Sequence, residues 1–112
     1  MLVDIAVKRE WKTTPYHGVT VSVLAENDAG GAQALLRLKA HAELPRHRHT
    51  GKENIYLLSG SIMVNDIQLH EGDFVSLAGE EIHKVIAMEA SIYMSVSEKS
   101  GTELIDTDSP YS

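Results

Sequence analysis

The chain has 112 residues, which suffices for one hydrophobic core and is too short for two domains of ordinary size. Sixteen acidic residues against ten basic ones give a formal net charge of −6, which argues against a nucleic-acid partner because phosphate binding needs a basic surface. The absence of cysteine excludes disulfides, thiolate metal sites and cysteine nucleophiles, so any metal site must use nitrogen and oxygen ligands.

Neither a secretory nor a membrane-spanning segment is recognisable. The N-terminal sequence lacks the basic-then-apolar order of a signal peptide, and no apolar run approaches the ~20 residues that a membrane span requires. We therefore expect a cytoplasmic protein with no membrane partner.

The first half of the chain favours extended structure. Residues 1–17 show no clean period, and Pro15 disfavours both helix and central strand, so we expect an N-terminal arm or an edge strand there. Alternating valines predict a half-buried strand over 19–25, closed by the turn-forming residues 27–31.

Residues 32–42 are ambiguous, because Ala, Leu, Gln and Lys favour helix. Apolar and polar side chains nevertheless alternate over this segment, which predicts a strand, with a helix as the alternative. The Glu43-Leu44-Pro45 sequence is expected to break this strand and lead the chain to His47.

Short, regularly spaced strands are predicted beyond Gly60. A tail from Glu98 onward is expected to run over the surface or to be partly ordered. Many short strands separated by turns predict a single all-β domain, an antiparallel barrel or sandwich. The predicted strands are 61–64, 67–69, 74–77, 82–87 and 91–97.

The segment from His47 to Gly60 concentrates metal-ligand types. His47 and His49 point to the same side of an extended chain, and Glu53 joins them if the intervening loop stays near strand geometry. His83 lies on a later predicted strand, where it shares a face with Val85 and Ala87. Three imidazoles and one carboxylate around an octahedral ion would leave two positions open for another molecule.

The segment resembles the first motif of the cupin superfamily, which runs glycine, five residues, His-x-His, three or four residues, Glu, six residues and Gly. Here His47, His49, Glu53 and Gly60 stand at the motif spacing, and His41 replaces the leading glycine.

The second cupin motif runs Gly, five residues, Pro-x-Gly, two residues, His, three residues and Asn. Gly72 and His83 match it, whereas Ala78, Glu80 and Ala87 replace the proline, the second glycine and the asparagine. Together the two motifs make a resemblance over roughly residues 32–97.

The resemblance implies a small antiparallel jelly-roll β-barrel. It also implies that His47, His49, Glu53 and His83 bind one divalent transition metal ion, namely Fe, Mn, Ni or Zn. A metal-dependent dioxygenase or isomerase acting on a small organic molecule is one expectation. The alternative is a non-catalytic sensing module, as in the metal-binding domain of anti-sigma factors. Cupins of this size commonly form homodimers through N-terminal strands, which the arm at 1–17 would suit.

Other polar side chains are assigned structural or surface roles. Tyr56 and Tyr93 each offer a phenol as a proton donor, although packing is the favoured role for both. Glu80 and Glu81 are expected to be solvated loop carboxylates rather than a general base. Three further histidines are assigned to the surface or to turns: His17, His41 and His70.

Overall fold

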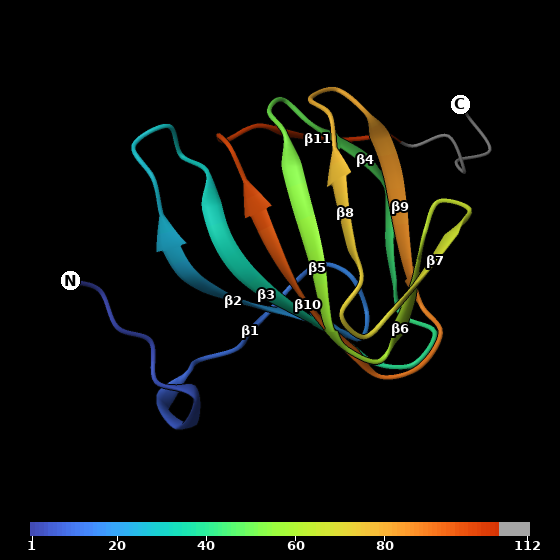
Figure 1. The fold of residues 1–112 in the computed structure, drawn as a ribbon, viewed down its shortest axis with the longest axis horizontal. Coiled ribbons are helices and arrows are strands. Elements are labelled where there is room, and N and C mark those ends of the chain that lie inside the picture. Colours follow the sequence, from blue (N-terminus) through green and yellow to red (C-terminus); the bar gives the residue numbers. More distant parts are fainter. Residues whose placement is uncertain (106–112) are drawn as a thin grey trace.

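The computed structural model describes residues 1–105, and their strands form two antiparallel sheets (Figure 1). The all-β class predicted from the sequence is confirmed. The six-stranded sheet has the order β1 (Lys12–Thr13), β2 (Val19–Glu26), β3 (Ala32–Leu38), β10 (Ser91–Ser97), β5 (Glu53–Ser59) and β8 (Phe74–Leu77). The five-stranded sheet has the order β11 (Thr102–Leu104), β4 (Glu43–His49), β9 (Ile82–Ala87), β6 (Ser61–Val64) and β7 (Ile67–His70).

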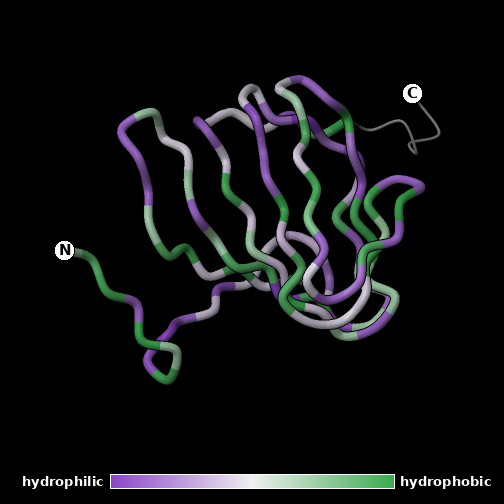
Figure 2. The backbone as a smooth tube through the Cα atoms, viewed as in Figure 1, coloured by the Kyte–Doolittle hydropathy of each residue, from purple (hydrophilic) through white to green (hydrophobic). Residues whose placement is uncertain are grey.

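Side chains from both sheets meet in one hydrophobic core. Ile55 and Leu57 on β5 pack in the same cluster as Ile62 on β6 and Val85 on β9, and all four are fully buried. Apolar and polar segments alternate along the chain, as expected for strands with one buried face (Figure 2). On β9 every second residue from His83 onward is buried, so the prediction that His83, Val85 and Ala87 share one face is confirmed.

One predicted strand ends earlier than its alternation indicated. β3 stops at Leu38, and the chain turns through residues 39–42 with His41 in the left-handed region at φ 70°. The prediction that the residues around Pro45 break a strand was wrong, because Pro45 lies inside β4. The pairing of β4 with β9 shifts register between Leu44 and His47, and this bulge accommodates a residue that has no N–H to donate.

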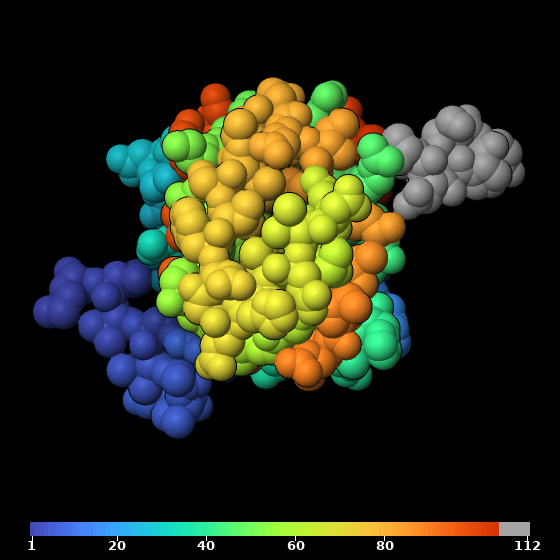
Figure 3. Space-filling model, turned by 45° about the vertical axis from the view of Figure 1, so that its right-hand side comes forward, coloured from blue at the N-terminus to red at the C-terminus, as the bar shows by residue number. Residues whose placement is uncertain are grey.

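The N-terminal segment forms little of the body. It contains a single 3-10 turn, η1 (Ala6–Lys8), and the edge strand β1, which pairs with β2. The part of the segment that precedes β1 projects from the body (Figure 3), and apolar side chains along it are exposed: Leu2 by 71%, Val3 by 66% and Val7 by 92%.

The C-terminal part contains a strand that the sequence did not predict. β11 pairs with β4 at the edge of the five-stranded sheet, in register with His47 and His49. Residues 106–112 of the expected tail lie outside the described part of the chain. Within residues 1–105, no helix has the length and apolar character needed to cross a membrane.

Candidate metal centre

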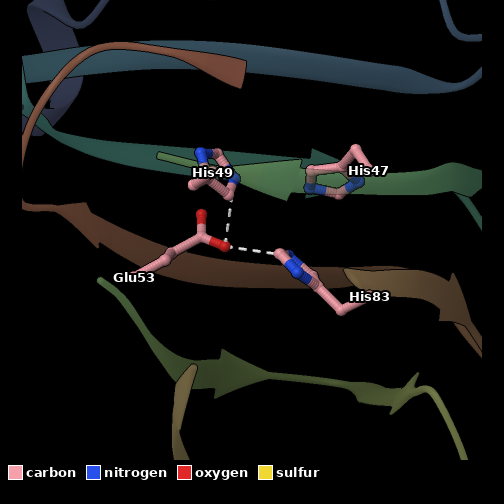
Figure 4. A group of neighbouring side chains, drawn as sticks. All are labelled: His47, His49, Glu53 and His83. Atoms are coloured by element: carbon pink, nitrogen blue, oxygen red, sulfur yellow. Dashed lines mark ion pairs between the residues drawn. The ribbon is translucent and has the colours of Figure 1, made fainter. Parts of the chain in front are cut away.

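The four predicted ligand residues come together from three strands (Figure 4). His47 and His49 lie on β4, and His83 lies on the adjacent β9 directly opposite His47. Glu53 begins β5 in the facing sheet. Ligand atoms from all four side chains lie within 4.8 Å of one another, so these residues could hold a metal ion.

Glu53 reaches the histidines by a different route from the one expected. We expected an extended loop that keeps His47, His49 and Glu53 on one face of a continuous chain. Instead β4 and β5 belong to opposite sheets, and a bend at residues 50–51 carries the chain across. The carboxylate therefore faces the imidazoles across the interior.

Three buried atoms in this cluster have no hydrogen-bond partner among the described residues: His49 Nε2, Glu53 Oε1 and His83 Nε2. Glu53 Oε1 lies 2.9 Å from His83 Nε2 and 3.2 Å from His49 Nε2, without hydrogen-bond geometry. Leaving such buried atoms unsatisfied costs roughly 1–3 kcal/mol each. Since they converge on one point, a cation there would satisfy all three, and the donor set fits a divalent transition metal.

The second ring nitrogens of the histidines face oxygen atoms. His47 Nδ1 donates to the Pro45 carbonyl oxygen at 2.7 Å, and His83 Nδ1 lies 3.5 Å from the Glu81 carbonyl oxygen. His49 Nδ1 lies 3.1 Å from the Thr102 hydroxyl on β11. A carbonyl oxygen only accepts, so the proton of His47 sits on Nδ1 and leaves the Nε2 lone pair free for a metal.

Burial and neighbouring groups set the charges of the site. Burial alone would raise the pKa of Glu53, but the adjacent His49 and His83 rings and the Ser95 hydroxyl outweigh it and hold that pKa well below its usual range. Burial lowers the pKa of His47 below 6.5, although the Pro45 carbonyl opposes this. Near neutral pH the site therefore presents a carboxylate and a neutral His47 imidazole, which are the forms that bind metals.

Ser95 and Thr102 contact two of the candidate ligand residues, and neither was identified from the sequence. Ser95 donates to Glu53 Oε2 at 2.5 Å, and Thr102 contacts His49. Ile92, Met94 and Val96 alternate along the last long strand, and this pattern favours these apolar residues on the inward face. In the structure β10 instead buries its intervening residues, so Ser95 points inward. The apolar pattern of this strand therefore indicated the wrong face, and the strand β11 was not predicted.

A cavity of about 220 Å³ adjoins the cluster. Its wall contains three of the four ligand residues together with aromatic, aliphatic and hydroxyl side chains. Two larger hollows of about 590 and 620 Å³ lie outside, along residues 13–20 and 37–45, and contain none of the four. The cavity is lined by Tyr16, Leu36, Leu44, His47, His49, Glu53, Tyr93, Ser95, Ser97, Thr102 and Leu104.

Two non-glycine residues that replace motif glycines keep left-handed backbone. His41 has φ 70° and Glu80 has φ 69°, a region that glycine occupies with least strain. Gly60, which matches its motif, has φ 89°, and an added Cβ there would lie 2.2 Å from Ser91 Oγ. The loop before His83 therefore retains a left-handed turn despite its altered sequence.

Several residues stay away from the cluster, as expected. His17, His41 and His70 are exposed. Glu80 Oε2 lies 3.6 Å from Arg48 and Glu81 accepts a hydrogen bond from the Ala78 N–H, so neither carboxylate joins the four ligand residues.

Sequence comparison places this site in a known family. The sequence model of the family described as the ChrR cupin-like domain matches residues 1–100. The chain belongs to this cupin family. The motif resemblance noted from the sequence is thereby confirmed. No curated protein sequence matches the chain.

Several solved structures share its fold. An acetylacetone dioxygenase from Acinetobacter johnsonii superposes with a TM-score of 0.84 at 16% identity, over 96% of this chain and 79% of the other. An RmlC-like cupin from Ralstonia eutropha gives 0.74 at 23% identity, covering 88% and 76%. A chain of the Rhodobacter sphaeroides complex of SigE with the anti-sigma ChrR gives 0.72 at 22% identity, over 85% of this chain and 49% of that one.

Proposed function

We propose that this cupin binds one divalent transition metal ion, Fe, Mn, Ni or Zn, and uses it to act on a small organic molecule. The observation that carries the proposal is the convergence of three buried side-chain atoms of His49, Glu53 and His83, which have no hydrogen-bond partner among residues 1–105, beside a cavity of about 220 Å³. His47 supplies the fourth ligand. A bound ion would supply a Lewis acid with two vacant positions if its coordination is octahedral.

The charges of the ligands indicate the kind of molecule that would bind. Glu53 contributes one negative charge and the histidines contribute none when neutral, so a divalent centre keeps a net charge of +1. Such a centre favours an anionic or enolisable oxygen donor. Leucine side chains on the cavity wall favour an apolar remainder. Dioxygenase or isomerase chemistry on such a compound is the activity we propose.

The fold and assembly belong to the same proposal. The two sheets correspond to the jelly-roll β-barrel of cupins, and residues 1–112 make a single domain. The exposed apolar side chains of the N-terminal segment, Leu2, Val3 and Val7, would be covered if two copies paired through it, which supports a homodimer. A cytoplasmic location is part of the same proposal.

A sensing role is the second candidate. The match to the ChrR cupin-like domain and the likeness to a chain of the SigE–ChrR complex support a module that binds a metal or a small molecule without turnover. Since fold does not decide between an enzyme and a binder, the two must be separated by assay.

The test is reconstitution of untagged, metal-free protein with each ion, followed by oxygen uptake and product analysis on a panel of diketones, thiols and phenols. Turnover that requires the metal and is lost in His49→Ala supports an enzyme. Tight, stoichiometric binding of a panel member with no turnover under any metal supports the sensing module. Absence of metal binding contradicts the metal-dependent enzyme and a metal-sensing module, and leaves only a module that binds a small molecule without a metal.

A further inference from the structure

Most polar side chains in the cavity wall already have partners. Ser95 donates to Glu53, Thr102 contacts His49 Nδ1, and the Ser97 hydroxyl lies 3.3 Å from the carbonyl oxygen of Ala32. These groups hold the ligands or the sheet in place. A molecule in the cavity that needs a hydrogen-bond donor therefore competes with the contacts that Ser95 and Ser97 already make.

Tyr93 differs from these residues. Its side chain is only 3% exposed, and its hydroxyl has no hydrogen-bond partner among residues 1–105. Tyr93 also lines the cavity beside the cluster. A phenol that is sheltered in this way readily donates a hydrogen bond to a molecule bound beside it.

The position of Tyr93 is set by β10. It lies two residues before Ser95 on the inward face, which places their Cα atoms about 7 Å apart along the strand. Ser95 touches Glu53, so Tyr93 lies one inward position further along the same wall. Other parts of the wall are apolar and include Leu36, Leu44 and Leu104.

We propose that the Tyr93 hydroxyl donates a hydrogen bond to a carbonyl or enolate oxygen of the metal-bound molecule and thereby selects ligands that carry this acceptor. The inference rests on the proposed metal site. It assigns to Tyr93 a specificity-determining role in place of the packing role expected from the sequence.

Tyr16 is the rival donor, because it also lines the cavity. It is half-buried and simultaneously lines the two outer hollows, which places it at the boundary of the cavity rather than within its wall. Tyr56 provides a matched control, since it lies on the adjacent strand β5 with its side chain on the outer face, 41% exposed.

The experiment uses full-length wild type, Tyr93→Phe, Tyr16→Phe and Tyr56→Phe, each loaded with Co(II). Pentane-2,4-dione, acetohydroxamate and catechol are titrated in, and binding is followed by the visible absorption of the cobalt. We expect Tyr93→Phe to bind the oxygen-donor probes about tenfold more weakly, the effect of one hydrogen bond to a charged or polarised acceptor. Affinity for Co(II) and the melting temperature of the metal-free protein should match wild type, because no protein partner of the hydroxyl is lost.

Several results would overturn the inference. Unchanged probe affinity in Tyr93→Phe, an equal loss in Tyr56→Phe, or a loss in Tyr16→Phe in place of Tyr93→Phe each contradicts it, as does failure of every probe to bind Co(II)-loaded wild type. Loss of Co(II) binding in Tyr93→Phe would show a structural role. Failure of wild type to bind Co(II) is a separate result and refutes the metal site itself.

Discussion

Metal should raise the thermal stability of this protein, and His49→Ala should abolish the rise. In metal-free protein the buried atoms His49 Nε2, Glu53 Oε1 and His83 Nε2 have no hydrogen-bond partner within the described part of the chain. A metal ion satisfies them only in the folded state, because β4, β5 and β9 bring the ligands together. Binding to the folded state alone shifts the unfolding equilibrium toward the native protein.

The expected size of the shift follows from linkage. Free metal at 100 times its dissociation constant adds about 2.7 kcal/mol to the free energy of unfolding. In a domain of this size, 1 kcal/mol corresponds to about 4 °C in melting temperature, so the metal should add about 10 °C. In the presence of a chelator, wild type and His49→Ala should differ by less than about 4 °C, since the His49 side chain is partly exposed, at 16%, and fills little of the core.

The assay is thermal unfolding followed by circular dichroism, with chelator and with Mn(II), Co(II), Ni(II) or Zn(II) in turn. His70→Ala is the matched control, because His70 is the last residue of β7, is not one of the four clustered residues, and has a side chain that is 68% exposed. Its metal-induced rise should equal that of wild type. An equal rise in wild type and His49→Ala, or no rise with any ion, would refute the reasoning.

Four further predictions follow from the same geometry. Ser95→Ala removes the hydrogen bond to Glu53 and should weaken metal binding about 10- to 100-fold in a competition titration, and unchanged affinity would contradict the supporting role. Metal-free protein should lose stability on acidification in two stages, because the pKa values of His47 and Glu53 are lowered in the folded state. As the pH falls, the unfolded chain is protonated before the folded chain, below pH 6.5 at His47 and below pH 4.5 at Glu53, so the free energy of unfolding decreases. His47→Gln should remove the upper stage of this decrease in a profile of stability against pH. Glu80→Gly should raise the free energy of unfolding by up to about 1 kcal/mol in urea titrations, because it relieves left-handed strain and removes only an exposed ion pair; a clear loss would show that the side chain matters more than the backbone. Deletion of residues 1–16 should convert a dimer to a monomer in light scattering, and an unchanged mass would exclude the dimer role of the arm.

Much of the candidate site was predictable from local patterns. The His-x-His pair and Glu53 lie close in sequence, and the burial alternation of β9 fixes the direction of His83. Which residues of a strand share one face depends only on their spacing along the chain, so the sequence alone predicts it.

The contacts of Thr102 and Ser95 with the site depend on pairing between segments that are distant in the sequence, and the alternation within one strand does not predict such pairing. Thr102 reaches His49 only because β11 pairs with β4, and Ser95 reaches Glu53 only because β10 pairs with β5. The crossing of Glu53 into the facing sheet has the same origin, since a bend of two residues decides which sheet the next strand joins. Strand register and sheet membership are tertiary outcomes and cannot be derived from one segment at a time.

Local sequence patterns led to a wrong prediction at two points. Alternation continued past Leu38 into a turn, and His41 adopts a backbone conformation that usually belongs to glycine. Pro45 indicated a break but lies at a bulge, where its missing N–H is tolerated. In each case the tertiary pairing of the strand outweighed the local preference of the residue.

The most direct test of the metal centre is the metal content of untagged protein, measured by elemental analysis after equilibration with each candidate ion and removal of the excess. The ligand cluster of His47, His49, Glu53 and His83 predicts close to one tightly held ion per chain in wild type and a loss of it in His49→Ala. Wild-type protein that retains no ion, or a variant that retains as much as wild type, would contradict the central claim.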